Sequence, residues 1–287
     1  RGWCVHLPRI RVRDDPLPLS LFIGWVLMNW NEEWNTSIKM TSRDRLNTGK
    51  FWDERICNSA PGHFPDRMTK DQLSIVGPEA DQRILEIGPG SGRLTIPMAR
   101  SSLEVTVVDP SVTMLKLLEE RSRSEDISNV RIVNDRWENV DIRAMGRYHK
   151  LVSSLSLFMY DIRDQMKRMN SVSDAVFLFV PADLRIPLGI QEILFGSAAI
   201  THTDFEILSN LAKDMGLEPH TQVLEYPGSV KFDSLSAASD YYCEFYNVPE
   251  SKKEAVMENL SSAMIVNDGK FATSISRHVG IICWQNG

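Results

Sequence analysis

The sequence predicts an α/β fold in which a seven-stranded, mostly parallel sheet carries helices on both faces. Two observations lead to this prediction. From residue 83 onward, short apolar runs alternate with amphipathic stretches, the pattern of strands joined by crossover helices. A glycine-rich turn at residues 88–92 directly follows the first apolar run, as it does where a parallel strand passes into a helix.

The first 80 residues lack this alternation. Residues 17–27 form an apolar run of 11 residues, whereas a membrane-spanning helix needs about 20. We therefore expect no membrane segment, and we expect residues 1–27 to be an extension outside the core, with the functional chain starting near Met28. Residues 28–80, rich in Trp, Asn, Asp and Arg, are expected to form an N-terminal helical cap.

The remaining residues, 81–287, are expected to form one domain with seven strands. Helices are predicted between the strands, at about 91–100, 112–121 and 162–169, with Asp161 as the N-cap of the last. A capping box from Thr203 to Glu206 opens another helix, which ends near Gly216. The strands are predicted at 83–87, 104–109, 130–134, 150–155, 175–180, 221–225 and 276–284.

Two segments fall outside the regular alternation of strands and helices. Residues 181–200 form no regular strand–helix unit, and the insertion at about 231–263 is typical of two helices. Both segments lie near the C-terminal strands. We expect them to form a lid or substrate cap.

The glycine-rich turn carries the main functional signal. Gly88, Gly90 and Gly92 allow close backbone approach, and the helix that follows offers free N–H groups to an anionic group. Arg93 stands where the dinucleotide fingerprint requires a small residue. Glu86 is unsuited to a neighbouring pyrophosphate but suits the ammonium group of an amino acid. The turn therefore favours S-adenosylmethionine (SAM) over a nicotinamide dinucleotide.

A second signal is the apolar run that ends in Asp109, 17 residues after Gly92. A carboxylate at the end of the second strand can accept hydrogen bonds from both ribose hydroxyls. Such a residue serves nicotinamide cofactors as well as SAM. It indicates nucleoside binding, with a helix-capping turn at residues 109–111 as the alternative.

These two motifs, together with NDRWENVD at 134–141 and SSLSLFMYD at 153–161, resemble those of the class I SAM-dependent methyltransferases. The resemblance covers about residues 51–213 and is closest to archaeal-type small methyltransferases of unassigned substrate. It implies a Rossmann-like fold, SAM as cofactor and methyltransferase activity. Leu155 departs from that group, where a His is expected, and no acidic-Pro-Pro-Tyr motif of the amide-nitrogen methylases follows the fourth strand.

The resemblance also implies roles for individual residues. The helix that contains residues 51–55 would close over the cofactor. The implied contacts are Glu86, Gly88, Gly90 and Gly92 for the methionine part, Asp109, Ser111 and Met114 for the ribose, Asp135, Arg136 and Trp137 for the adenine, and Ser153 and Ser154 beneath the sulfonium.

Catalytic residues are harder to predict, because methyl transfer needs a general base only if the acceptor must lose a proton. Tyr160, Asp161 and His202 follow strands at the expected active-site edge and are the candidates. Asp161 is also explained as a helix cap, and Tyr160 as a half-buried aromatic residue. Trp30 and Trp34, four residues apart, indicate a core-facing helix stripe or, alternatively, part of a cage for a cationic substrate.

Composition limits the partners. The formal net charge is −6 and there is no basic tail, so we expect a small-molecule acceptor and no nucleic acid. The four cysteines form no CxxC pair, so we expect no metal site. We expect the cysteines to be separate reduced thiols in a cytoplasmic protein. The alternatives are an RNA or protein methyltransferase, a nicotinamide-dependent oxidoreductase, and a SAM-binding protein without catalytic activity.

Overall fold

The computed structural model describes residues 28–56, 66–184, 188–196, 201–267 and 269–286. The expected extension at 1–27 lies outside these residues. Over the described part of the chain, no helix is both long enough and apolar enough to cross a bilayer.

The sheet is the predicted one, with seven strands in the order β3-β2-β1-β4-β5-β8-β6 and a short eighth strand, β7, paired to β8. The first five strands in this order are parallel, and β8 runs antiparallel to both of its long neighbours. The strands are β1 Arg83–Ile87, β2 Glu104–Val108, β3 Val130–Val133, β4 Tyr148–Ser154, β5 Ser173–Pro181, β6 His220–Phe232, β7 Ile265–Asn267 and β8 Lys270–Gln285.

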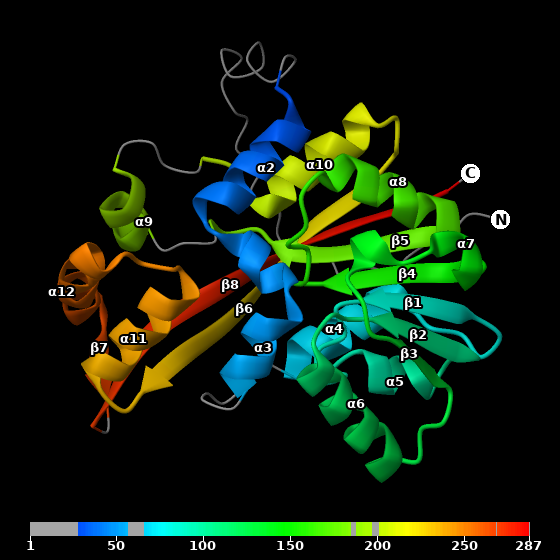
Figure 1. The fold of residues 1–287 in the computed structure, drawn as a ribbon, viewed down its shortest axis with the longest axis horizontal. Helices are drawn as coiled ribbons and strands as arrows, with labels where there is room; N and C mark the ends of the chain where they lie inside the picture. The colour runs from blue at the N-terminus through cyan, green and yellow to red at the C-terminus, as the bar shows by residue number, and fades with distance from the viewer. Residues whose placement is uncertain (1–27, 57–65, 185–187, 197–200, 268, 287) are drawn as a thin grey trace.

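Helices cover both faces of the sheet, as predicted (Figure 1). Two groups of helices pack on the sheet, one on each face, and a separate buried cluster joins each group to its face. The first group is α4 Asp66–Val76, α5 Thr95–Ala99 and α6 Val112–Ser124, and the second is α2 Trp30–Met40, α7 Ile142–Met145, α8 Ile162–Val172 and α10 Asp204–Asp214.

Two local predictions need correction. The helix expected at 91–100 is only the five-residue α5, because residues 90–94 form a turn in which Gly90 and Gly92 have positive φ. Asp161 precedes α8 but makes no side-chain cap, since its backbone is left-handed and its carboxylate accepts a hydrogen bond from Asn35 instead. The capping box of α10 is present as predicted.

The tryptophan stripe belongs to the core. Trp30 and Trp34 are 2% and 0% exposed, and the Trp34 indole donates to the carbonyl of Met159 at 2.7 Å. This burial excludes the two rings from an open cage for a cationic substrate.

Strands β6 and β8 continue beyond the end of β5, since β5 pairs with β8 only as far as Val279 whereas β6 pairs with it as far as Phe271. At the tip of this ribbon lies a group of elements with its own buried cluster, gathered at one end of the molecule in Figure 1. We call this group the cap module; it consists of α9 Leu188–Phe195, α11 Leu235–Phe245, α12 Lys253–Ala263 and β7.

The N-terminal segment connects the two parts. After α2 come the 3-10 helix η2 Arg43–Asn47 and the helix α3 Gly49–Ile56. Arg43 pairs with Asp204 of α10 at 3.0 Å, and Arg45 donates to the carbonyl of Glu244 in α11 at 2.6 Å. The segment thus contacts both the sheet helices and the cap module.

Candidate cofactor and acceptor site

The glycine turn leaves β1 at the carboxyl edge of the parallel strands. Gly88, Gly90 and Gly92 all have positive φ, at 69°, 55° and 88°. A Cβ on Gly88 would lie 2.3 Å from Ser156 and one on Gly92 would lie 2.4 Å from Leu118, whereas a Cβ on Gly90 would meet nothing within 4 Å. Two of the glycines therefore serve packing, and Gly90 faces open space.

Asp109 follows β2 directly and lies beside this turn. Its side chain is 6% exposed; one oxygen accepts from the Ser111 amide at 2.9 Å and the other from the Gly90 amide at 3.4 Å. Burial raises the pKa of this carboxyl to about 6. Asp109 thus links the end of β2 to the glycine turn, and each of its oxygens has a further lone pair that could accept from a hydroxyl group.

Glu86 is the second buried carboxyl group at this edge. It is 2% exposed and accepts from the Thr95 hydroxyl at 2.6 Å. Burial raises its pKa to about 7, and nearby Arg93 opposes that rise. A buried carboxylate of this kind is well suited to a cationic partner.

A polar network that sequence reasoning missed lies on the same side. Arg93 donates to Thr69 at 3.2 Å, to Gln72 at 2.8 Å and to Ser154 at 2.8 Å. It thereby joins α4, the glycine turn and the end of β4. In the sequence, Arg93 argues only against a dinucleotide cofactor. Its contacts with α4 could not be predicted, because no local pattern indicates that α4 packs against this turn.

The end of β4 is held by serines. The Ser153 and Ser156 hydroxyls are 2.9 Å apart, and Ser156 donates to the Ile87 carbonyl at 2.7 Å. Leu155 lies between them with φ +58°, in the left-handed region that a residue with a Cβ rarely adopts. Ser153 and Ser154 therefore lie beside the glycine turn, while Leu155 marks a sharp bend in the backbone.

Helix α3 contacts the segment that follows Asp109, at the start of α6. Its Asp53 accepts from the Ser111 hydroxyl at 2.6 Å and from the Thr113 amide at 2.9 Å, both at the start of α6. A Cβ on Gly49 would lie 2.1 Å from the Pro110 carbonyl oxygen, so α3 begins in close contact with the segment after Asp109. Met114, one turn into α6, is half-buried.

The loop after β3 holds the residues expected near the adenine. Asp135 accepts from the Arg136 amide at 2.7 Å, and Asn47 of η2 donates to Glu138 at 2.6 Å. Trp137 is 2% exposed, with the Arg168 guanidinium 5.3 Å from its ring centroid. Its ring thus belongs to the core and supports the loop from behind, whereas Asp135 and Arg136 are only half-buried.

The three catalytic candidates do not form one group. His202 lies 3.0 Å from Glu33 and packs edge-on against Trp30, so its contacts are with α2. Asp161 is bonded to Asn35. Tyr160 is 37% exposed, and burial together with Asp44 raises its pKa. Among the described residues, no group of three or more His, Cys, Asp or Glu side chains is placed to hold a metal ion.

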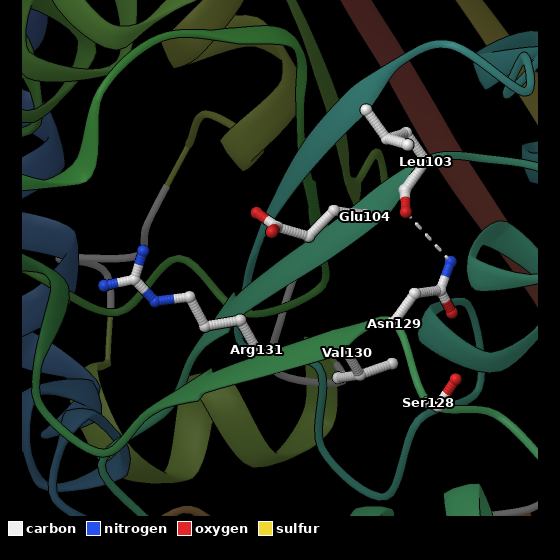
Figure 2. A pocket seen from close by; sticks show the side chains of 6 residues that line it. All are labelled: Leu103, Glu104, Ser128, Asn129, Val130 and Arg131. Carbon is white, nitrogen blue, oxygen red and sulfur yellow. Dashed lines mark hydrogen bonds between the residues drawn. The ribbon is translucent and has the colours of Figure 1, made fainter.

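A separate hollow opens at the opposite edge of the sheet, where β2 and β3 begin (Figure 2). Asn129 donates there to the carbonyl of Leu103 at 3.3 Å. Because the glycine turn lies at the carboxyl ends of the strands, this hollow is not part of the cofactor site. Its lining residues are Leu103, Glu104, Ser128, Asn129, Val130 and Arg131.

The strand order, the glycine turn and the acidic end of β2 together define a Rossmann-like domain of the class I methyltransferase type. A family profile described as "Methyltransferase domain" matches residues 84–175, the segment from β1 to β5. These residues therefore form a SAM-dependent methyltransferase domain, as the motifs predict, and SAM is the cofactor of this class.

Curated relatives share parts of the chain. A ribosomal RNA small subunit methyltransferase A from Desulforapulum autotrophicum is 33% identical over 80 residues, which are 28% of this chain and 28% of that protein. Another of this name, from Mesoplasma florum, is 22% identical over 219 residues, 71% of each chain. The match thus covers less than two thirds of the first of these relatives.

Solved structures share the fold. The YcgJ protein from Bacillus subtilis superposes with a TM-score of 0.57 at 12% identity, over 78% of this chain and 100% of that one. A protein from Bacillus halodurans C-125 superposes with a TM-score of 0.54 at 12% identity, over 76% of this chain and 98% of that one. At such identities the likeness concerns the fold alone.

Proposed function

We propose that this protein transfers the methyl group of SAM to a small-molecule acceptor. The observation that carries the proposal is the carboxyl edge of β1 and β2, where Gly90 faces open space and two buried carboxyl groups, Glu86 and Asp109, lie at the ends of neighbouring strands. This arrangement suits a ligand with an ammonium group at one end and a ribose at the other.

The residues present fit such a cofactor. Gly88, Gly90 and Gly92 form a backbone cradle in which a Cβ on Gly90 would occupy the open space. Glu86 would hold the methionine ammonium group, and Asp109 would accept from the ribose hydroxyls, with Ser111 and Met114 alongside. Asp135 and Arg136 would border the adenine in front of Trp137, and Ser153 and Ser154 would lie beneath the sulfonium.

The chemistry asks little of acid–base groups. SAM supplies a methyl group on a sulfonium, so one carbon–sulfur bond breaks as the bond to the acceptor forms. The protein would contribute by aligning the acceptor and excluding water, effects that reach about 7–11 kcal/mol in the best intramolecular models. Tyr160, at the exposed end of the β4–α8 loop, would be the nearest of the candidates to an incoming acceptor, and no general base is assigned.

Charge favours a small acceptor over RNA. Residues 235–263 of the cap module carry five carboxylates, Asp240, Glu244, Glu250, Glu254 and Glu258, against two lysines. RNA binding depends on neutralising phosphates with Lys and Arg, and an acidic cap module disfavours it. Because some relatives are named as ribosomal RNA methyltransferases, RNA is the alternative acceptor. Binding of RNA to this protein that weakens steeply with rising salt concentration would support that alternative.

Calorimetric titration with SAM, S-adenosylhomocysteine and NADH tests the proposal. We expect saturable binding of the two adenosyl ligands and none of NADH. In Asp109→Ala the SAM affinity should fall by about tenfold or more, because two hydrogen bonds to a charged acceptor are lost. Binding of NADH alone would contradict the proposal, and an unchanged affinity in Asp109→Ala would remove this carboxylate from the site.

A further inference from the structure

The network around Arg93 contains a buried polar atom without a partner. Gln72 of α4 is 1% exposed, and its side-chain oxygen accepts from Arg93 at 2.8 Å and from Ser154 at 3.1 Å. Because a guanidinium only donates, this contact fixes the amide orientation. The Gln72 Nε2 group has no hydrogen-bond partner among the residues that the structure describes, and a buried donor left unpaired is costly.

The network is centred on the Ser154 hydroxyl at the carboxyl end of β4. This hydroxyl accepts from Arg93 and donates to the side-chain oxygen of Gln72, beside the glycine turn to which Arg93 itself belongs. A guanidinium with a neighbouring amide N–H₂ group is a donor set that matches a carboxylate. The opposite requirement, an acceptor for an ammonium group, is met by Glu86, whose charge acts on Arg93 directly.

We infer that Arg93 and Gln72 form the subsite for the α-carboxylate of the methionine part of SAM, opposite Glu86 for its α-ammonium group. The inference rests on the proposed function and assigns residues that neither the motifs nor the family match point to. The bound carboxylate would give the Gln72 amide its missing acceptor. Arg93 then has two tasks, since it also joins α4 to the end of β4.

The test compares three ligands that share adenosine and differ in the tail. SAM has the carboxylate, decarboxylated SAM lacks only that group, and methylthioadenosine lacks the whole amino-acid part. In the unaltered protein we expect SAM to bind at least about tenfold more tightly than decarboxylated SAM, as charge-assisted hydrogen bonds imply. Isothermal titration gives the ratio of the two dissociation constants.

Arg93→Met and Gln72→Leu should lower this ratio towards one while methylthioadenosine binds as before. Arg100→Met is the matched control, because Arg100 lies at the end of α5 and pairs with Glu125 at the surface; its ratio should not change. A merely structural role for Arg93 would weaken all three ligands together and leave the ratio unchanged.

Two results would overturn the inference while leaving the proposed function intact. One is a ratio near one in the unaltered protein, which would mean that the carboxylate is not recognised. The other is a ratio that survives both substitutions. Absence of binding by all three ligands would instead refute the proposed function, so the two failures are distinguishable.

Discussion

Glu86 illustrates at the scale of one residue how a group proposed to bind a cofactor can lower the stability of the ligand-free protein. Its carboxyl group is buried beneath the glycine turn, and its pKa is raised to about 7, chiefly by burial. A folded-state pKa above the ordinary 4.5 means that protonation favours the folded state. The contribution of Glu86 to stability is therefore complete below about pH 4.5 and is lost as the pH rises through about 7.

Replacing Glu86 by Gln should consequently stabilise the ligand-free protein at alkaline pH. The expected gain at pH 8 is about 3 kcal/mol, at about 1.4 kcal/mol for each pH unit between the two pKa values. The amide oxygen can still accept from Thr95. Urea unfolding at pH 4.5 and pH 8 measures the change, and SAM affinity should fall in the same variant.

Asp109 supplies the internal control for this experiment. Its pKa is raised to about 6 by burial, so Asp109 also makes the protein less stable as the pH rises through 6. The Glu86→Gln variant keeps this contribution, and its total loss of stability with rising pH should be smaller than that of the parent protein. A variant as pH-dependent as the parent protein would contradict the role of Glu86. Equal stability of the two proteins at pH 8 would contradict it as well.

At the scale of elements, a buried ion pair holds the N-terminal segment on the sheet helices. Arg43 and Asp204 have side chains 4% and 2% exposed, and both Asp204 oxygens accept from Arg43 at 3.0 Å. Arg43 also donates to Ser37 at 2.7 Å. Removing one partner of such a pair leaves an uncompensated buried charge.

Asp204→Ala should therefore cost about 3–5 kcal/mol of unfolding free energy. The double variant Arg43→Met/Asp204→Leu should recover most of that loss, because replacing both charges by apolar groups removes the uncompensated one. Denaturant unfolding measures both. As a control, Glu125→Ala breaks the solvent-accessible pairs with Arg100 and Arg121 and should cost less than about 1 kcal/mol for each. A loss as large as that of Asp204→Ala would contradict the larger contribution of the buried pair.

Across the whole molecule, cofactor site and cap module have separate buried clusters. Phe232 and Phe271 face each other at the last pair of the β6–β8 ribbon. An Asn-Gly turn in place of residues 233–270 would therefore close the ribbon as a two-residue hairpin. This variant removes α11, α12 and β7 but none of the residues proposed to hold SAM.

We expect the hairpin variant to bind SAM with an affinity within about threefold of the parent protein. Such a change corresponds to less than the roughly 1.4 kcal/mol of binding free energy that a tenfold change represents. Methylation of a small-molecule acceptor found by screening should be lost, because the segment that we expect to cap the substrate is gone. Titration and a methyl-transfer assay measure the two effects. Retained methylation would place the acceptor elsewhere, and circular dichroism checks that the sheet is intact.

Local pattern was enough to predict the parallel core. The apolar run of β1, the glycines after it, Asp109 at the end of β2 and the capping box of α10 all depend on residues close together in the sequence. The resemblance added the identity of the cofactor, and the domain match agrees with it. The expected boundaries of the domains and the roles of the individual site residues stay predictions.

The length of the ribbon was not predictable from local pattern. Pro227 and Gly228 look like the end of a strand, but β6 continues to Phe232 because it is the outer strand of the sheet, where a proline needs no hydrogen-bonding partner on its free side. The cap module that this ribbon carries follows from pairing between residues that lie 39 to 55 positions apart in the chain, from Phe232 with Phe271 to Leu224 with Val279.

Contacts between distant segments decided the rest. Asp53 reaches the start of α6, and Gln72 meets Arg93 and Ser154 only because α4 packs over the glycine turn. By itself, therefore, the sequence determined the strand–turn–helix units, since these depend on short-range periodicity and backbone geometry, and the resemblance of its motifs to a known family indicated the cofactor. Only the tertiary structure decided which side chains of other elements reach the glycine turn, because hydrogen bonds between remote elements leave no periodic trace in the chain.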